Sequence, residues 1–440
     1  VENYLGIPYA APPTGNLRFS PPRPVQSWEG VRNASVFGNE CVQTSPGGPM
    51  SEDCLYLNVW VPRTGGQMLS VMVYIHGGAL QSGTGNKEGA DWLAAIGDVI
   101  VVAMNYRLNV FGFLSTGDRN SPGNYGLMDQ RAAIVWVKEN IHNFGGDPDS
   151  ITVYGLSAGS IAVSHQMLSP KNNGLFSRVI CESGVATGPG TINYHPMESV
   201  RKLCNVMNCT SDDAAGMVSH LRAADPVQLT NAAATFTGKS HLLVRTPPLR
   251  YWAPVIDGDF IPEEPLHILE SGVLQNRDLL LGSNDDEGGY LFGDPGFLAV
   301  NNVLMIKMGL SRALWTNACS LSQTTPIYQI FSLTYDYDMW NEEDPASLRR
   351  SLVDLYGDFT YVANTVQTAN IYSKRNYTTY MYQFAHRLSN SPFPPGVGAS
   401  HANNHFFIFP SSDFLERATV DEKNLMRTMI KLWTNFAKTG

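Results

Sequence analysis

The stretch that most constrains the fold is ITVYGLSAGS, residues 151–160, in which a β-branched run ends on the pattern G-x-S-x-G. This pattern is typical of a tight turn from a buried strand into a helix, with the serine, Ser157, held at the bend. Glycines at positions 155 and 159 would let the backbone fold back on itself. Five residues are weak evidence alone, because glycine and serine are common in loops, so the rest of the chain has to support the interpretation.

Apolar runs and helical patterns alternate on both sides of this turn. Leu127, Ile134, Val137 and Ile141 recur at helical spacing. Further helices are expected after the serine and near the chain end, at 158–169 and 423–438. Strands are expected at the buried runs 69–75, 99–104, 151–154 and 178–183, with later candidates at 278–283 and 378–384. The alternation predicts an α/β fold with a large, mostly parallel central sheet flanked by helices.

The chain of 440 residues shows no internal repeat, low-complexity tract or clear linker. We therefore expect one large domain over residues 1–440, with insertions. Residues 290–375 are expected to be largely helical. The chain opens at VENYLGIPYAAPP, already within a pattern and without a signal peptide, so we expect that an earlier segment is missing.

Composition narrows the possible partners. Apolar residues make up 43% of the chain and charged residues 16%, which is typical of a globular protein. The formal net charge is −9 and no Lys/Arg run is present, so nucleic acid is not an expected partner. No apolar run is as long as a membrane-spanning helix, so no transmembrane segment is expected.

A serine nucleophile needs a base, and the base needs an orienting carboxylate. On this architecture the order along the chain is serine, acid, histidine. His386 ends a strand, where a histidine is usually structural, and His405 comes later, whereas His401 lies in the glycine-rich loop GVGASHANN that suits a base. The acid candidates follow the strand at 278–283, at the strand end where such sheets place their chemistry: Asp285, Asp286 and Glu287.

The sequence His76-Gly77-Gly78 follows the expected strand at 69–75. Acyl transfer creates an oxyanion that needs N–H donors aimed at it, and losing one such donor costs about 3–4 kcal/mol of barrier. Gly77 and Gly78 can turn their amides inward, and the residue after the nucleophile, Ala158, supplies a third amide. This chemistry needs no metal ion and no organic cofactor.

Cysteines and glycosylation sequons favour a secreted glycoprotein over a cytosolic protein with six incidental thiols. Cys41 and Cys54 bracket a turn-rich loop, and Cys204 and Cys209 lie close together. The acceptor residues of the N-x-S/T sequons are Asn33, Asn208 and Asn376.

The chain resembles the type-B carboxylesterase/cholinesterase family over nearly its whole length. The resemblance is carried by LGIPYAAPPTGNLRF, SEDCLYLNVWVP, VYIHGGAL, NYRLNVFGFLS, GNYGLMDQRAAIVWVKENIHNFGGDP, GLSAGS and NDDEGG. It implies an α/β-hydrolase that lacks the family's N-terminal strands and C-terminal segment. Within the family, the subgroup of bile-salt-activated lipases is most similar, through GNYGL, LSPKNNGLFSRVICESGVA, PVIDGDFIP and LWTNFAKTG.

The resemblance implies a role for each candidate residue. Ser157 is the expected nucleophile, Glu287 the triad acid and His401 the base, and Gly77, Gly78 and Ala158 match the oxyanion hole. It also implies structural pairs: a Cys41–Cys54 disulfide and the ion pairs Arg18–Glu52 and Arg107–Asp147. The second family disulfide is altered, because the position of its downstream cysteine in the family falls near His220 in this chain. Cys204 could therefore pair with Cys209 instead, and Cys181 and Cys319 would then be free and buried.

Two departures from the family pattern narrow the substrate. Leu156 stands where the family usually has glutamate, and the loop between Cys41 and Cys54 lacks the tryptophan on which cholinesterases hold a quaternary ammonium. We therefore expect hydrolysis of neutral, lipophilic small-molecule esters, with a possible lipid or bile-salt interface. The alternatives are a cholinesterase and a non-catalytic member, since adhesion and hormone-precursor domains occur in the family. Trp136 is expected in the core, while Phe111 and Phe113 could line an acyl pocket or pack in the core.

Overall fold

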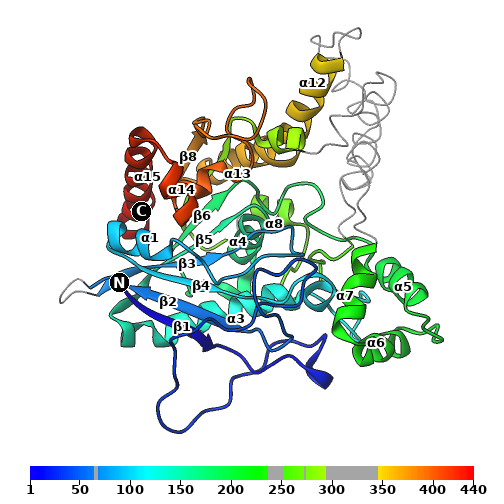
Figure 1. Cartoon of the computed structure of the whole chain (residues 1–440). Helices are drawn as coiled ribbons and strands as arrows, with labels where there is room; N and C mark the ends of the chain where they lie inside the picture. Colours follow the sequence, from blue (N-terminus) through cyan, green and yellow to red (C-terminus); the bar gives the residue numbers. More distant parts are fainter. Residues whose placement is uncertain (64–67, 236–250, 272–273, 294–344) are drawn as a thin grey trace.

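A single eight-stranded sheet forms the centre of the molecule (Figure 1). The computed structural model describes residues 1–63, 68–235, 251–271, 274–293 and 345–440. The strand order is β1-β2-β4-β3-β5-β6-β7-β8. The strands are β1 Glu2–Pro8, β2 Tyr56–Val61, β3 Leu69–Ile75, β4 Ile100–Met104, β5 Gly146–Leu156, β6 Arg178–Glu182, β7 Asp278–Asn284 and β8 Thr379–Phe384.

The six strands from β4 to β8 in this order run parallel, and β1 and β2 form an antiparallel edge. The predicted mostly parallel α/β fold is therefore confirmed. The six predicted strands are all present, although β5 begins at Gly146 and is longer than the predicted 151–154. Strands β1 and β2 were not predicted.

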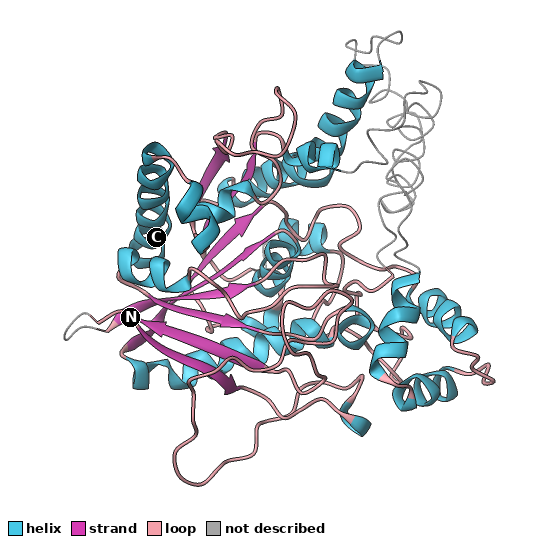
Figure 2. Ribbon diagram, viewed as in Figure 1, coloured by secondary structure: helices cyan, strands magenta, loops and turns pink. Residues whose placement is uncertain are grey.

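Helices cover both faces of the sheet, as Figure 2 shows. Alternate residues of the strands face opposite clusters: Val71 and Val73 of β3 pack in one, with helices α3 and α4, and Met72 and Tyr74 in the other, with α1 and α15. The helices are α1 Ala90–Gly97, α2 Asn109–Phe113, α3 Tyr125–Asn140, α4 Ala158–Leu168, α5 Pro196–Val206, α6 Ala214–Ala223, α7 Pro226–Ala234, α8 Pro265–Ser271, α12 Pro345–Gly357, α13 Ala363–Ser373, α14 Ser412–Arg417 and α15 Val420–Thr439.

The predicted helices are confirmed. Helix α3 buries Leu127, Ile134 and Val137, three of the four residues whose spacing predicted it; the fourth, Ile141, is buried in the 3-10 helix η2 (Ile141–Phe144) that follows. Helix α15 begins earlier than predicted, at a capping box in which Thr419 and Glu422 bond each other's backbone N–H. Within the predicted helical region 290–375, the described part is helical over η5 (Glu287–Gly293), α12, the π-helix η6 (Asp358–Val362) and α13. Residues 294–344 of that region lie outside the described residues.

One of the two implied ion pairs is present and the other is wrong. Arg18 bonds Glu52 at 2.5 Å, as expected. Arg107 bonds Asp129 of α3 instead of Asp147, with Nη2 2.7 Å from Oδ1 and Nε 2.7 Å from Oδ2. The positions of the two carboxylates explain the difference. The fully buried carboxylate of Asp129 lies on α3, next to the guanidinium, whereas Asp147 lies at the start of β5 and accepts the N–H of Asp149.

Removing the Asp129 carboxylate should destabilise the fold strongly. Asp129→Ala leaves the Arg107 guanidinium buried without its counter-charge, so we expect a loss of about 3–5 kcal/mol in the free energy of unfolding. Urea denaturation followed by circular dichroism measures this change. Asp149→Ala, which removes an exposed partner of Lys138, is the control and should unfold at nearly the same urea concentration as the wild type. An equal, small change in both variants would contradict the prediction.

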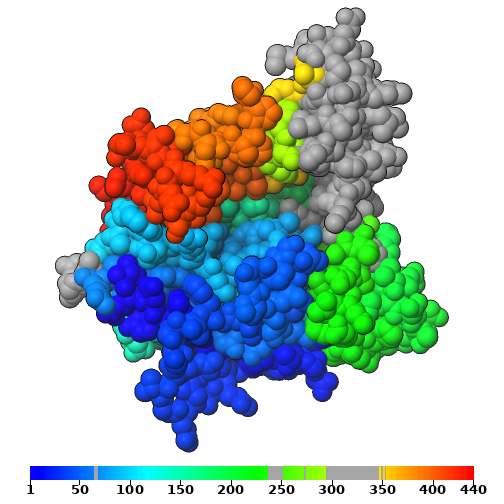
Figure 3. All heavy atoms as spheres, in the orientation of Figure 1, coloured from blue at the N-terminus to red at the C-terminus, as the bar shows by residue number. Residues whose placement is uncertain are grey.

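Disulfides join Cys41 to Cys54 and Cys204 to Cys209. Cys181 is free and buried, and Cys319 lies outside the described residues. The three sequon asparagines, Asn33, Asn208 and Asn376, are all exposed or partly exposed, so glycans could be carried there. Figure 3 shows that part of the N-terminal segment, coloured blue, projects from the lower edge of the molecule.

The two phenylalanines whose role was left open pack in the core, whereas Trp136, predicted to be in the core, lies at its edge. Phe111 and Phe113 are buried in the cluster that contains α3 and α4, and Phe111 stacks on Phe19. Trp136 packs against that cluster while remaining partly exposed, beside Phe144. The core interpretation therefore holds for both phenylalanines.

Candidate functional site

Ser157 lies at the sharp bend between β5 and α4, with φ 59° and ψ −125°. A non-glycine residue in this region carries backbone strain of about 1–3 kcal/mol. Neighbouring bonds hold it there: its N–H donates to the Glu182 carbonyl at 2.8 Å, and its own carbonyl accepts from Ile161 at 2.9 Å. Glycine is needed at 159, because a Cβ there would lie 2.1 Å from the Ile75 carbonyl oxygen.

A chain of two hydrogen bonds links Ser157, His401 and Glu287. His401 Nε2 lies 2.8 Å from the Ser157 hydroxyl oxygen, and His401 Nδ1 lies 2.6 Å from Glu287 Oε2. The residues come from three separate parts of the sequence and meet at the carboxyl ends of the strands. The Glu287 side chain is fully buried and that of His401 is 15% exposed, so the imidazole can meet a ligand while the carboxylate cannot.

The second oxygen of Glu287 is held by two further donors. The Ser183 hydroxyl donates to Oε1 at 2.6 Å, and the Asn284 backbone N–H donates to the same atom at 2.7 Å. Both oxygens therefore have fixed partners, which sets the orientation of the carboxylate toward His401. Ser183 was not predicted; its place directly after the end of β6 was the only signal in the sequence.

The other two acid candidates hold the histidine loop. The Asp285 carboxylate accepts the Ala399 N–H at 2.8 Å, and that of Asp286 accepts the Gly398 N–H at 2.9 Å. Asp286 also bonds Arg350 of α12 at 2.6 Å. These carboxylates fix the backbone just before His401 and do not take the position of Glu287.

The other two histidine candidates lie away from the serine. His386 Nε2 bonds the Glu422 carboxylate at 3.3 Å, which links the segment after β8 to α15. His405 is buried, with Nε2 3.2 Å from the Tyr74 hydroxyl. Burial lowers the pKa of His405 well below its usual value, so this ring stays neutral. His401 alone of the three bonds Ser157.

An aromatic ring packs against the imidazole of His401. Tyr361, in the π-helix η6, stacks on it with ring centroids 4.5 Å apart and an interplanar angle of 25°. Tyr290 is a second neighbour of the ring, with centroids 5.9 Å apart. Stacking restricts rotation of the imidazole, and no pattern in the sequence indicated either contact.

The backbone near Ser157 offers several amides. Ala158 is the first residue of α4, and the first N–H groups of a helix have no acceptor within it. A Cβ on Gly77 would lie 3.2 Å from the Ser157 Cβ, so this segment adjoins Ser157. Gly78 has φ +110° and is exposed, and so is Ala79 with φ 58°.

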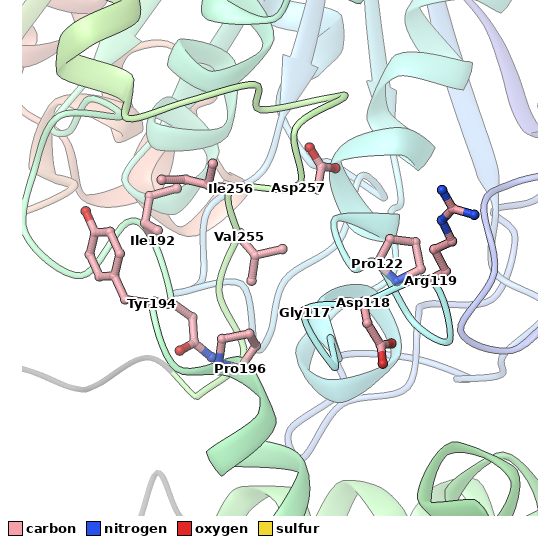
Figure 4. Close-up of a pocket in the computed structure, with 11 residues that line it drawn as sticks. Gly117, Asp118, Arg119, Pro122, Ile192, Tyr194, Pro196, Val255, Ile256 and Asp257 are labelled. Atoms are coloured by element: carbon pink, nitrogen blue, oxygen red, sulfur yellow. The ribbon is translucent and has the colours of Figure 1, made fainter. Parts of the chain in front are cut away.

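A cavity of about 420 Å³ lies apart from these residues and includes none of the three linked side chains (Figure 4). Its charged residues include Asp118 and Asp257, whose carboxylates are already bonded to neighbouring N–H and O–H groups. The lining residues are Gly117, Asp118, Arg119, Pro122, Ile192, Asn193, Tyr194, Pro196, Val255, Ile256 and Asp257.

Within the described ranges, no group of three or more His, Cys, Asp or Glu side chains is arranged to hold a metal ion. None of the helices in that part of the chain combines the length and apolar character needed to cross a membrane.

Comparison with known proteins gives one consistent result. The model of the carboxylesterase family matches residues 1–440. The chain is 37% identical over 466 residues to acetylcholinesterase of Bungarus fasciatus, with all of this chain and 75% of the relative covered. It is 35% identical over 468 residues to carboxylesterase 5A of Mus musculus, of which 78% is covered. Neuroligin-3 of Mus musculus is 34% identical over 507 residues, with 58% of it covered.

Proposed function

The chain belongs to the carboxylesterase family, and from that premise we propose that it hydrolyses neutral carboxylic esters through an acyl-enzyme. The observation that carries the proposal is the hydrogen-bonded series Ser157–His401–Glu287. Turnover of 4-nitrophenyl butyrate by the purified protein tests it directly. We also propose that the protein is secreted, supported by two disulfides and three accessible sequons. The resemblance to bile-salt-activated lipase, with its lipid or bile-salt partner, stays a prediction.

The geometry supports the following steps. His401 Nε2 accepts the hydroxyl proton as Ser157 Oγ attacks the ester carbonyl carbon. His401 Nδ1–H donates to Glu287, whose charge stabilises the imidazolium. The imidazolium protonates the leaving alcohol, and the imidazole then takes a proton from the water that attacks the acyl-enzyme. As the acid leaves, the imidazolium returns this proton to Ser157 Oγ, which restores the serine hydroxyl and the neutral imidazole.

Backbone amides next to Ser157 supply the oxyanion hole in this proposal. Gly78 and Ala158 are supported by their positions, one exposed in the turn after β3 and the other at the start of α4. Gly77 remains a candidate, because an added Cβ on it would lie 3.2 Å from the Ser157 Cβ. We add Ala79, which is exposed with φ 58°, as an alternative third donor.

We expect the site to prefer an uncharged alcohol group. Leu156, next to the nucleophile, offers no charge to compensate the loss of water around a quaternary ammonium. We therefore expect kcat/KM for 3,3-dimethylbutyl acetate, which has the shape of acetylcholine without its charge, to be about tenfold or more above that for acetylcholine. The variant Leu156→Glu should narrow this ratio by restoring a carboxylate. A clear preference of the wild type for acetylcholine would instead favour a cholinesterase.

A non-catalytic role is the second candidate, because the family implied by the resemblance contains members without activity. The observation against it is that serine, histidine and glutamate are all present and hydrogen-bonded. Absence of turnover on any neutral ester, in a sample that unfolds cooperatively, would support the non-catalytic role.

A further inference from the structure

The end of strand β6 contacts two of the three proposed catalytic residues. The Glu182 carbonyl accepts the Ser157 N–H at 2.8 Å, which helps to hold the strained bend. The next residue, Ser183, donates its hydroxyl to Glu287 at 2.6 Å. A shift of this two-residue segment would therefore disturb both the nucleophile and the acid.

The side chain of Glu182 points to the opposite face of the sheet. It shares that face with Ile180, two residues earlier, whose side chain lies in the apolar cluster with α1 and α15. Glu182 is fully buried there. Trp433 of α15 donates its indole N–H to Oε1 at 2.7 Å, and the Tyr154 hydroxyl donates to Oε2 at 3.1 Å.

The end of β6 is thus tied to α15 through one carboxyl group. In the part of the chain that is described, no Lys or Arg forms an ion pair with Glu182, and the ionisable nitrogen that comes near it is His405 Nδ1, 3.9 Å from Oε2. A buried carboxylate without a cation is unfavourable by several kcal/mol unless it keeps its proton. Because burying this carboxyl group is unfavourable, its presence here indicates a role that depends on its hydrogen bonds and that an apolar side chain could not perform.

We infer that Glu182 is a positioning residue of the hydrolytic site: its side chain, bonded to Trp433 and Tyr154, holds the strand end that supports Ser157 and Glu287. The inference rests on the proposed function, because it assigns Glu182 a part in ester hydrolysis. Glu182 touches no substrate; it acts through the bonds at Ser157 and Ser183.

The surroundings keep this carboxyl neutral near pH 7. Burial raises the pKa of Glu182 to about 8, and the charge of Glu287 adds to the shift, against hydrogen bonds that lower it. Burial also raises the pKa values of the facing tyrosines and lowers that of His405, so these groups remain neutral. The groups that face Glu182 are Tyr74 of β3, with Lys87 above its ring, Tyr154 of β5, Cys181 of β6, Tyr382 of β8, Glu287 of η5, Asn404 and His405 of η7 (Asn403–Phe407) and Trp433 of α15.

Two substitutions separate the hydrogen bonds from the charge. Glu182→Gln keeps an acceptor for Trp433, so kcat near pH 7 should stay within about threefold of the wild type. The wild type should lose activity above about pH 8, as Glu182 ionises beside Glu287, whereas Glu182→Gln should not lose it. Glu182→Leu removes the hydrogen bonds and should lower kcat about tenfold or more with KM unchanged.

The variant Trp433→Phe tests whether the alkaline loss of activity follows the pKa of Glu182. The indole N–H lowers the pKa of Glu182, so its removal should move the alkaline loss of activity to higher pH. A role limited to packing would leave the pH profile in place. Wild-type kcat in Glu182→Leu, or an alkaline limb that is the same in the wild type and Glu182→Gln, would overturn the inference.

A stability measurement keeps the test independent of turnover. The pKa of Glu182 in the folded state lies above its ordinary value of 4.5. Between about pH 4.5 and 8 the folded state therefore binds more protons than the unfolded state, and the wild type loses stability as the pH rises through that range. The melting temperature of Glu182→Gln relative to the wild type should therefore increase from pH 5 to pH 8.5. If the wild type hydrolyses no ester, the proposed function fails; if this relative shift is absent, the account of Glu182 fails.

Discussion

Replacing Ser157 with alanine should reduce ester turnover by about 10⁴- to 10⁶-fold while the protein stays folded. The substitution removes the only hydroxyl that His401 Nε2 bonds among the described residues, so no acyl-enzyme can form. It also leaves the backbone N–H of residue 157 free to bond the Glu182 carbonyl, so the bend between β5 and α4 keeps its support. Initial rates on 4-nitrophenyl butyrate and a thermal melt measure the two quantities.

Ser164→Ala is the matched control for this substitution. Ser164 lies in helix α4, which begins directly after Ser157, and its buried side chain is about two turns along the helix from the bend. Its variant should retain turnover within about twofold. A fluorophosphonate probe should label the wild type and the control at Ser157 and leave Ser157→Ala unlabelled. Equal turnover in the wild type and Ser157→Ala would remove the basis of the proposed mechanism.

The sheet and the serine turn were predictable because their signals are local. Strand β3 is apolar or aromatic at every position that is fully buried, and its predicted bounds, 69–75, are those observed. Gly159 is required by contact with the Ile75 carbonyl, so the pattern around Ser157 reflects a steric need that any sequence with this turn must meet. The strands β1 and β2 were harder, because an antiparallel edge lacks the continuous apolar run of a parallel core strand.

The contacts that complete the site depend on the tertiary structure. Tyr361 reaches the His401 ring from a π-helix 40 residues earlier in the chain, and no spacing in the sequence predicts such a pairing. The partner of Arg107 was assigned to Asp147 from family resemblance and is Asp129 instead, because burial on α3 decides which carboxylate meets the guanidinium. Local patterns therefore identify the side chains proposed to react, whereas the contacts that hold these side chains in place depend on how the elements pack.

Glu287→Gln should lower kcat by about 10⁴-fold with little change in KM. In the wild type, Oε1 accepts from the Ser183 hydroxyl and the Asn284 N–H, and Oε2 accepts from His401 Nδ1. Because two donors point at the Oε1 position, the amide oxygen of the glutamine should occupy that position. The amide NH₂ then faces His401.

That orientation places a donor against His401 Nδ1, so the imidazole has to keep its proton on Nε2, which then faces Ser157 as a donor and cannot accept the hydroxyl proton. Full kcat and KM measurements with 4-nitrophenyl butyrate test this prediction, with Glu416→Gln, an exposed glutamate on α14, as the control. Since the glutamine side chain keeps the volume of the carboxyl group it replaces, the melting temperature should fall far less than kcat. Retained turnover in Glu287→Gln would mean that the buried charge does not support the histidine as a base.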